Sequence, residues 1–254
     1  MSDVDAWLAA LAQRHLANLT RPELTRALRA LSSCYVERRD KLMSGAALDG
    51  AGKRAAFALF YGPLHFFTVT AVVRAMLAHE MPIDTIVDLG CGTGVGGAAW
   101  ANASVKPPAI VGVDRNGWAV EEANWTYRTL GLSGQARTGD LGRGDVLARL
   151  PIRRLAGSAM LLAYTVNELP ADTRAALLER VSQGLRAGAR LLLVEPIARG
   201  VTTWWPEWTA RLSAEGARAD EWRFPAALPP LTRQIAKGAG LDPREFTARS
   251  IAKL

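Results

Sequence analysis

The chain has 254 residues, of which 49% are apolar and 22% charged, and these values exclude a disordered or fibrous protein. A chain of this length buries a substantial core, either as one large domain or as a core with a smaller attachment. Lysine and arginine outnumber aspartate and glutamate by 31 to 24, and the formal net charge of +7 suits a polyanionic partner such as RNA.

Cysteine and histidine are scarce. The two cysteines, Cys34 and Cys91, are too few for a disulfide framework and fit a reducing compartment. The three histidines, His15, His65 and His79, lack the spacing of metal ligands, so we predict no metal site. An acidic N-terminus, unlike a secretory signal or a transit peptide, favours a cytoplasmic location.

Helical periodicity dominates the first 81 residues, and we predict an all-helical N-terminal domain over 1–81. Residues 20–23 resemble a capping box with Pro22 in the first turn of a helix. Residues 55–73 carry no charged side chain, but Gly62 and Pro63 interrupt them. We therefore predict two helices buried in a soluble protein and no membrane segment.

The pattern changes at residue 82. Short apolar runs cover residues 85–88, 109–114, 159–164 and 191–195, and segments of helical length separate them, at 117–130 and 171–184. Short continuous apolar strands that alternate with helices are typical of a parallel sheet covered on both faces. We predict an α/β, doubly wound, Rossmann-like domain over 82–254.

A glycine-rich turn, "IVDLGCGTGVGG", ends the first predicted strand at residues 86–97. In a doubly wound sheet, glycines at this turn let the backbone approach a ligand closely. Asp114 ends the second predicted strand, 20 residues after Gly94, where a carboxylate can accept both hydrogen bonds from a ribose diol. The turn therefore indicates a nucleoside-containing ligand.

Two ligand classes use such a turn. Gly92, Gly94 and Gly97 satisfy the dinucleotide pattern, which on its own would admit a nicotinamide or flavin enzyme. Asp88 favours the other class, because a carboxylate beside the turn would repel a pyrophosphate. S-adenosylmethionine presents an ammonium and a sulfonium, which that carboxylate attracts, so we predict a methyl-donor turn.

The motif "VDLGCGTG", followed by "VGVDRN", resembles the class I S-adenosylmethionine-dependent methyltransferases from residue 82 to the C-terminus. The resemblance implies S-adenosylmethionine as cofactor and gives a role to each matched position. The methionine part of the donor would contact Asp88 and the backbone of Gly90, Cys91, Gly92 and Gly94.

The same resemblance assigns the nucleoside end of the donor. Asp114 would bind the ribose hydroxyls, and Arg115 would lie beside the adenine. Asp140, in "RTGDL" after a short third strand, would meet the adenine amino group, and Leu141 would cover the ring. Asp140 could instead be a turn residue or a helix cap.

The fourth predicted strand runs into "AYTVNELP", at the same edge as the donor turn. We expect Tyr164, Asn167 and Glu168 to face the methyl group or its acceptor, as candidate catalytic residues. Asn167 could equally cap the following helix. Methyl transfer to a good nucleophile needs mainly alignment and exclusion of water, so these residues do not identify the acceptor atom.

A narrower resemblance covers more of the chain. The segments "ALSSCYVERRD", "YTVNELP" and "LLLVEPIARG" occur in an order similar to the ribosomal small-subunit methyltransferase-like family, and this implies rRNA or the small ribosomal subunit as partner. Members of that family often carry a cysteine cluster after the "VEP" strand. No cysteine follows Glu195 here, so we expect no iron–sulfur cluster.

Four tryptophans lie after the fifth predicted strand: Trp204, Trp205, Trp208 and Trp222. We expect packing for them rather than stacking on bases. Three functions remain open: an rRNA methyltransferase, a non-catalytic assembly factor that binds S-adenosylmethionine, and a small-molecule methyltransferase with a helical lid. A wide basic rim around the pocket would favour RNA, whereas a closed apolar cavity would favour a small molecule.

Overall fold

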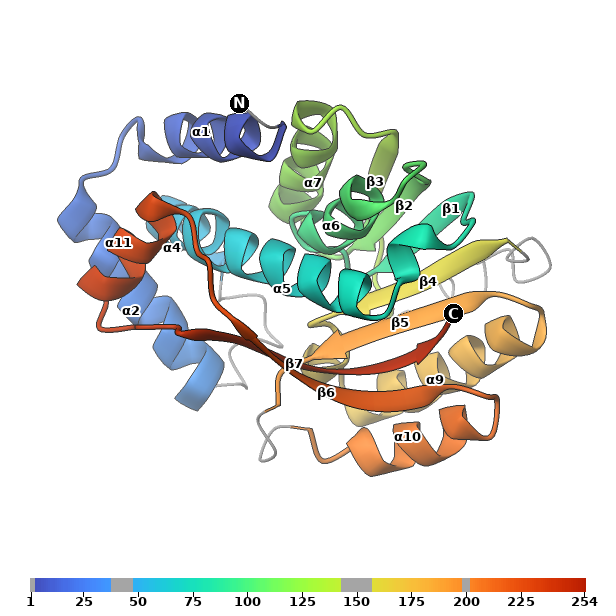
Figure 1. Ribbon diagram of the computed structural model, residues 1–254. Coiled ribbons are helices and arrows are strands. Elements are labelled where there is room, and N and C mark those ends of the chain that lie inside the picture. The colour runs from blue at the N-terminus through green and yellow to red at the C-terminus, as the bar shows by residue number, and fades with distance from the viewer. Residues whose placement is uncertain (1–2, 38–47, 143–156, 198–201) are drawn as a thin grey trace.

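A computed structural model of the chain describes residues 3–37, 48–142, 157–197 and 202–254, with the side chains of 34–37 left outside the description. The described residues form a seven-stranded sheet with the order β3-β2-β1-β4-β5-β7-β6 (Figure 1). Five strands are parallel: β1 Thr85–Leu89, β2 Ala109–Asp114, β3 Gly134–Thr138, β4 Ser158–Ala163 and β5 Arg190–Glu195. This confirms the doubly wound sheet.

Two further strands make the sheet mixed, and the sequence analysis missed both. β6 (Arg218–Pro225) and β7 (Glu245–Lys253) pair antiparallel with each other, and β7 pairs antiparallel with β5. The predicted parallel sheet therefore does not extend to this edge, where the pairing is antiparallel. β6 carries four charged residues in eight, and no continuous apolar run marks it because its side chains alternate between exposed and half-buried.

Helices cover both faces of the sheet (Figure 1). Alternate strand residues supply the two cores, so Ile86 and Leu161 pack in one and Val87 and Leu162 in the other. The first core includes α5 (Gly62–Ala75), α6 (Val95–Ala103) and α7 (Gly117–Thr129), and the second includes α9 (Ala171–Arg186) and α10 (Trp205–Ser213). Burial on both faces explains why the central strands are continuously apolar.

The N-terminal helices α1 (Asp3–Leu16) and α2 (Arg21–Glu37) pack into the first of these cores through Trp7, Leu24 and Leu28. Helix α11 (Pro230–Gly238) also contributes to this core. The predicted capping box is present: Glu23 Oε2 accepts from the Thr20 backbone N–H at 2.9 Å. None of the described residues up to position 81 lies in a strand, as predicted.

Residues 51–75 form one continuous helix, which corrects the prediction of two. It runs through α4 (Ala51–Ala56), a π-helical turn η2 (Phe57–Tyr61) and α5. Proline lacks the N–H that an α-helix needs. The wider turn before Pro63 absorbs that loss, with the Gly62 N–H bonding the carbonyl of Phe57. The helix is long and apolar enough to cross a membrane, yet 61% of its most apolar window is buried inside the protein.

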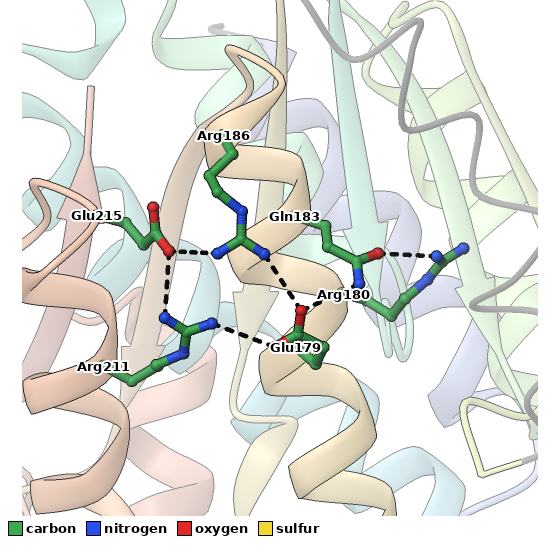
Figure 2. A network of polar contacts seen from close by, with 6 residues as sticks. All are labelled: Glu179, Arg180, Gln183, Arg186, Arg211 and Glu215. Atoms are coloured by element: carbon green, nitrogen blue, oxygen red, sulfur yellow. Dashed lines mark hydrogen bonds and ion pairs between the residues drawn. The ribbon is translucent and has the colours of Figure 1, made fainter.

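Helices α9 and α10 are joined by charged side chains (Figure 2). Arg211 of α10 pairs with Glu179 of α9 at 3.2 Å, and Arg186 of α9 pairs with Glu215, just beyond α10, at 2.6 Å. Trp204 and Trp208, at the start of α10, are buried in the second core, at 5% and 1% exposed. The packing interpretation of these two tryptophans is confirmed.

Candidate active site

A cavity of about 800 Å³ lies at the carboxyl ends of β1 and β4, where the strand order reverses. Open α/β sheets bind their ligands at this position, and the volume falls in the upper part of the range for ligand sites, roughly 300–1,000 Å³. Eleven of the twelve predicted site residues line the cavity: Asp88, Gly90, Cys91, Gly92, Asp114, Arg115, Asp140, Leu141, Tyr164, Asn167 and Glu168. Gly94 does not line it.

The glycine turn follows β1 directly and is fixed to β2 by its own backbone. The N–H groups of Gly90 and Cys91 both donate to the carbonyl of Val113, at 2.8 and 3.0 Å. Gly92 has a φ of +52° and faces open space, whereas Gly94, at +77°, lies against Tyr127 and the backbone of α7. Gly92 therefore opens the turn toward the cavity, and Gly94 holds it against the helix behind.

Asp88 lies at the inner end of this turn and is 1% exposed. Its Oδ2 accepts from the Gly97 N–H at 3.0 Å, but its Oδ1 has no hydrogen-bond partner among the described residues. Burial raises the pKa of Asp88 to about 7, because a carboxylate is costly away from water. A cationic donor group placed at Oδ1 would offset that cost and hold Asp88 as the anion.

Asp114 lies at the end of β2, as the sequence predicted. Its Oδ2 accepts from the Gly92 N–H at 2.9 Å and its Oδ1 accepts from the Asn116 N–H at 2.8 Å. Each oxygen keeps a lone pair for a further donor. Burial raises the pKa of Asp114, and these backbone hydrogen bonds oppose the rise. The carboxylate is thus oriented in advance to accept two hydroxyl groups.

Asp140 and Leu141 form the next part of the wall. Asp140 Oδ1 accepts from the Gly142 N–H at 2.8 Å, so the turn role considered for Asp140 is present. Leu141 is 6% exposed and belongs to the second core. The adenine contacts of both residues stay a prediction. Cys91, also 6% exposed, is a buried free thiol whose pKa burial raises.

Tyr164 follows β4 with a φ of +58°, a conformation that non-glycine residues adopt rarely. Its ring stacks on the imidazole of His65, with centroids 3.7 Å apart and planes 12° apart. Thr68, on the same helix as His65, lines the cavity together with Tyr164. His65 and Thr68 belong to the 51–75 helix, so that helix and the end of β4 together line the cavity.

Asn167 lies in a short 3₁₀ turn, η5 (Val166–Glu168), and does not cap α9. The capping alternative was wrong, because Pro170 takes the cap position without a side-chain bond. The amide of Asn167 is held on both sides. Its Oδ1 accepts from Trp204 Nε1 at 2.9 Å, and its Nδ2 donates to Glu195 Oε2 at 2.6 Å.

Sequence reasoning missed the residues that close the cavity. One face of the 51–75 helix supplies Phe57, Tyr61, Leu64, His65 and Thr68, and the C-terminal segment supplies Pro243, Glu245 and Thr247. The signal for the first group was a helical spacing of aromatic and polar side chains within an apolar segment. The second group had none, because β7 was not predicted.

The residues present fit S-adenosylmethionine. Two buried polar atoms on the cavity wall, Asp88 Oδ1 and Thr93 Oγ1, have no partner among the described residues and could bind donor groups of a ligand. The carboxylates beside the glycine turn, Asp88 and Asp114, attract an ammonium and a sulfonium and repel a pyrophosphate. The structural placement thus agrees with the preference for a methyl donor over a dinucleotide.

Comparisons with known proteins agree with this geometry. Residues 69–147 match the family model of the methyltransferase small domain. No curated protein matches the chain in sequence. The solved structure of the mitomycin 7-O-methyltransferase MmcR superposes with a TM-score of 0.53 at 16% identity, covering 91% of this chain and 66% of that chain.

Two further solved structures are similar at lower TM-scores. A SAM-dependent methyltransferase from Aquifex aeolicus gives 0.46 at 15% identity, covering 72% of this chain and 88% of its own. The tRNA (uracil-54, C5)-methyltransferase of Pyrococcus abyssi, in complex with S-adenosyl-L-homocysteine, gives 0.42 at 15% identity, covering 74% of this chain and 38% of its own.

The fold is the Rossmann-like methyltransferase fold. The matched segment runs from α5 past β3 and contains the glycine turn, Asp88 and Asp114. Fold and family match together define the class: an S-adenosylmethionine-dependent methyltransferase. Neither the fold nor the match specifies the methyl acceptor.

Proposed function

We propose that the protein transfers a methyl group from S-adenosylmethionine to a small molecule held in this cavity. The charge of the wall carries this proposal. Among the described lining residues that are not assigned to the donor, none is an arginine or lysine, whereas Glu168, Glu195 and Glu245 are acidic. Such a wall repels the phosphates of RNA from the site of transfer.

The concave shape and mainly apolar lining of the cavity support the same proposal. Most of its lining surface is apolar, and Phe57, Tyr61 and Leu64 of the 51–75 helix line it on one side. Glu245 and Thr247 of β7 reach it from another part of the chain. Sites for small organic molecules are concave and mainly apolar, with a few polar groups that orient the ligand.

The chain's own residues then have separate tasks. When bound, S-adenosylmethionine supplies a methyl group activated by the sulfonium. Asp114 would bind the ribose hydroxyls, and Asp88 would hold the cationic methionine end. The covering helix would exclude water and keep the acceptor aligned, which is the main requirement of methyl transfer.

Ribosomal RNA is the second candidate, because the net charge of +7 favours a polyanionic partner. RNA would then bind outside the cavity and present one base to it. The segments that resemble the small-subunit family run partly into residues 38–40 and 198–200, which lie outside the described residues. The acidic wall makes RNA the weaker candidate.

One labelling experiment separates the two. The protein is incubated with methyl-labelled S-adenosylmethionine and either a small-molecule cell extract or purified small ribosomal subunits. We expect label in the small-molecule fraction, where mass spectrometry would identify the product. Label confined to rRNA would overturn the proposal, and donor binding without any transfer would indicate a non-catalytic factor.

A further inference from the structure

Glu195 ends β5 and is the most enclosed carboxylate on the cavity wall, at 0% exposed. Its Oε1 accepts from the Val166 backbone N–H at 2.8 Å, and its Oε2 accepts from Asn167 Nδ2 at 2.6 Å. A second, longer bond of 3.4 Å joins Oε1 to the Asn167 backbone N–H. A carboxylate has about four acceptor positions, so Oε2 keeps one for a ligand or a proton.

Trp204 determines the direction of these hydrogen bonds. An indole N–H only donates, so Oδ1 of Asn167 must be the atom that faces Trp204. The Nδ2 of Asn167 then necessarily points at Glu195 as a donor. Helix α10 begins one residue later and is tied to α9 by the charged network of Figure 2. Trp204 and Asn167 are therefore positioning residues for Glu195.

Other charged groups surround Glu195 on the neighbouring elements. Burial raises the pKa of Glu195 to about 8, the backbone hydrogen bonds oppose the rise, and the negative charge of Glu168 on η5 adds to it. Arg249 lies opposite on β7 and lowers it. The Tyr164 N–H donates to the carbonyl of Val194 at 2.8 Å, which places the end of β4 beside Glu195.

From this arrangement we infer that Glu195 binds the protonated amine of the methyl acceptor and takes its proton before methyl transfer. The inference deepens the proposed function and rests on it. The acceptor class is then a primary or secondary amine attached to an apolar body.

Three features favour an amine over a hydroxyl or an anion. The carboxylates Glu168 and Glu195 attract a cation and repel an anion. The rings of Phe57, Tyr61 and Tyr164 line the same cavity, and aromatic faces attract cations. A carboxyl group that ionises near neutral pH is suited to receive a proton from an ammonium, whereas an alcohol is a far weaker acid.

The step balances in atoms and charge. The ammonium gives one proton to Oε2 of Glu195, which becomes a neutral carboxylic acid and leaves a lone pair on nitrogen. That lone pair forms a new N–C bond with the methyl carbon as the C–S bond breaks, and the C–S electron pair stays on sulfur. S-adenosylhomocysteine and a methylated ammonium result, and Glu195 later returns its proton to water.

Three probes with the same ring test the inference: benzylamine, benzyl alcohol and benzoate. Binding to the full-length protein in the presence of S-adenosylhomocysteine is measured by calorimetry, and methylation is measured with labelled donor. We expect benzylamine to bind about tenfold or more tightly than benzoate, and to be methylated fastest.

Glu195→Gln should weaken benzylamine binding about tenfold while donor affinity changes by less than about twofold. Glu80→Gln is the matched control. Glu80 is 61% exposed and precedes β1, so it lies toward the amino ends of the parallel strands, whereas the cavity lies at their carboxyl ends. We expect the control to behave as wild type in both assays.

In Glu195→Gln the new amide nitrogen would face Asn167 Nδ2, and two donors facing each other would destabilise the fold. A double variant controls for this loss of stability. In Glu195→Gln with Asn167→Asp, the new amide can donate to the new carboxylate, which still accepts from Trp204. This variant should recover the Tm of wild type, yet methylate benzylamine at least about tenfold more slowly. Recovery of the rate together with the Tm would show that Glu195 is merely structural.

The outcomes separate this inference from the proposed function. Preference for benzyl alcohol or benzoate, an unchanged affinity in Glu195→Gln, or no binding of any probe would overturn the amine assignment. Each of these leaves the proposed function standing if the extract experiment labels a small molecule. Labelling of rRNA alone would overturn both.

Discussion

The imidazole of His65 lies flat on the phenol ring of Tyr164, 3.7 Å from centroid to centroid. His65 lies on the 51–75 helix, and Tyr164 follows the end of β4, 99 residues later in the sequence. Tyr164 is in a left-handed backbone conformation, which costs about 1–2 kcal/mol. The stack helps to hold that conformation and joins the end of β4 to the 51–75 helix over the site.

His65→Ala should loosen this cover, because it removes the ring that Tyr164 stacks on. We expect faster hydrogen exchange over residues 57–68 and a donor affinity several-fold weaker, whereas His65→Phe keeps the stack and stays close to wild type. Burial lowers the pKa of His65 to about 3, so the imidazole is neutral from pH 5 to pH 9. A pH–rate profile that changed shape in His65→Phe would contradict a purely packing role.

Asp114→Ala should weaken S-adenosylmethionine binding by about tenfold or more, or about 1.4 kcal/mol, because two hydroxyl groups lose their acceptor. Calorimetry measures the affinity, and the Tm checks that the variant is folded. Asp84→Ala is the control, since Asp84 is exposed and lies at the amino end of β1, whereas the cavity is at the carboxyl end of that strand. An unchanged affinity in Asp114→Ala would refute the ribose assignment.

Asp88 should make the ligand-free protein less stable as the pH rises. Burial raises the pKa of Asp88 from 3.8 to about 7, so between these values the folded state binds more protons than the unfolded chain. The contribution of Asp88 to the free energy of unfolding therefore falls as pH increases through this window.

Asp88→Asn removes that titration and can keep the hydrogen bond from Gly97. Relative to this variant, wild type should lose on the order of 1 kcal/mol or more of unfolding free energy between pH 5 and pH 8. Urea denaturation at the two pH values gives the difference. The assignment fails if wild type and variant change in parallel.

Gly94→Ala should destabilise the fold more than a glycine change that costs only backbone strain. A Cβ at Gly94 would lie 2.8 Å from the Tyr127 ring and 2.9 Å from the backbone of Ala123. Gly131 has a similar positive φ with nothing within 4 Å, so Gly131→Ala measures the strain alone, about 1–2 kcal/mol. We expect Gly94→Ala to cost a further 1–3 kcal/mol, roughly, in urea denaturation. Equal losses would show that the turn does not pack tightly against α7.

The sequence by itself determined where the residues of the predicted donor half of the site lie. Asp88, the glycines and Asp114 are found at strand ends because apolar runs, turn glycines and carboxylates are local signals. Hydrogen bonds over short stretches or between neighbouring parallel strands position these residues, as the 2.9 Å bond from Gly92 to Asp114 illustrates. Local chemistry was sufficient there.

Only the tertiary structure decided the acceptor half. The π-helical turn carries helix 51–75 past Pro63 and over the cavity, and β6 and β7 are too charged or too irregular in pattern to be recognised beforehand. Glu195 is positioned by Val166 and Asn167, which donate to it, and by Trp204, which orients Asn167, and folding brings these residues together. The direction of a buried hydrogen bond depends on which donors surround it, and a linear sequence does not specify those neighbours.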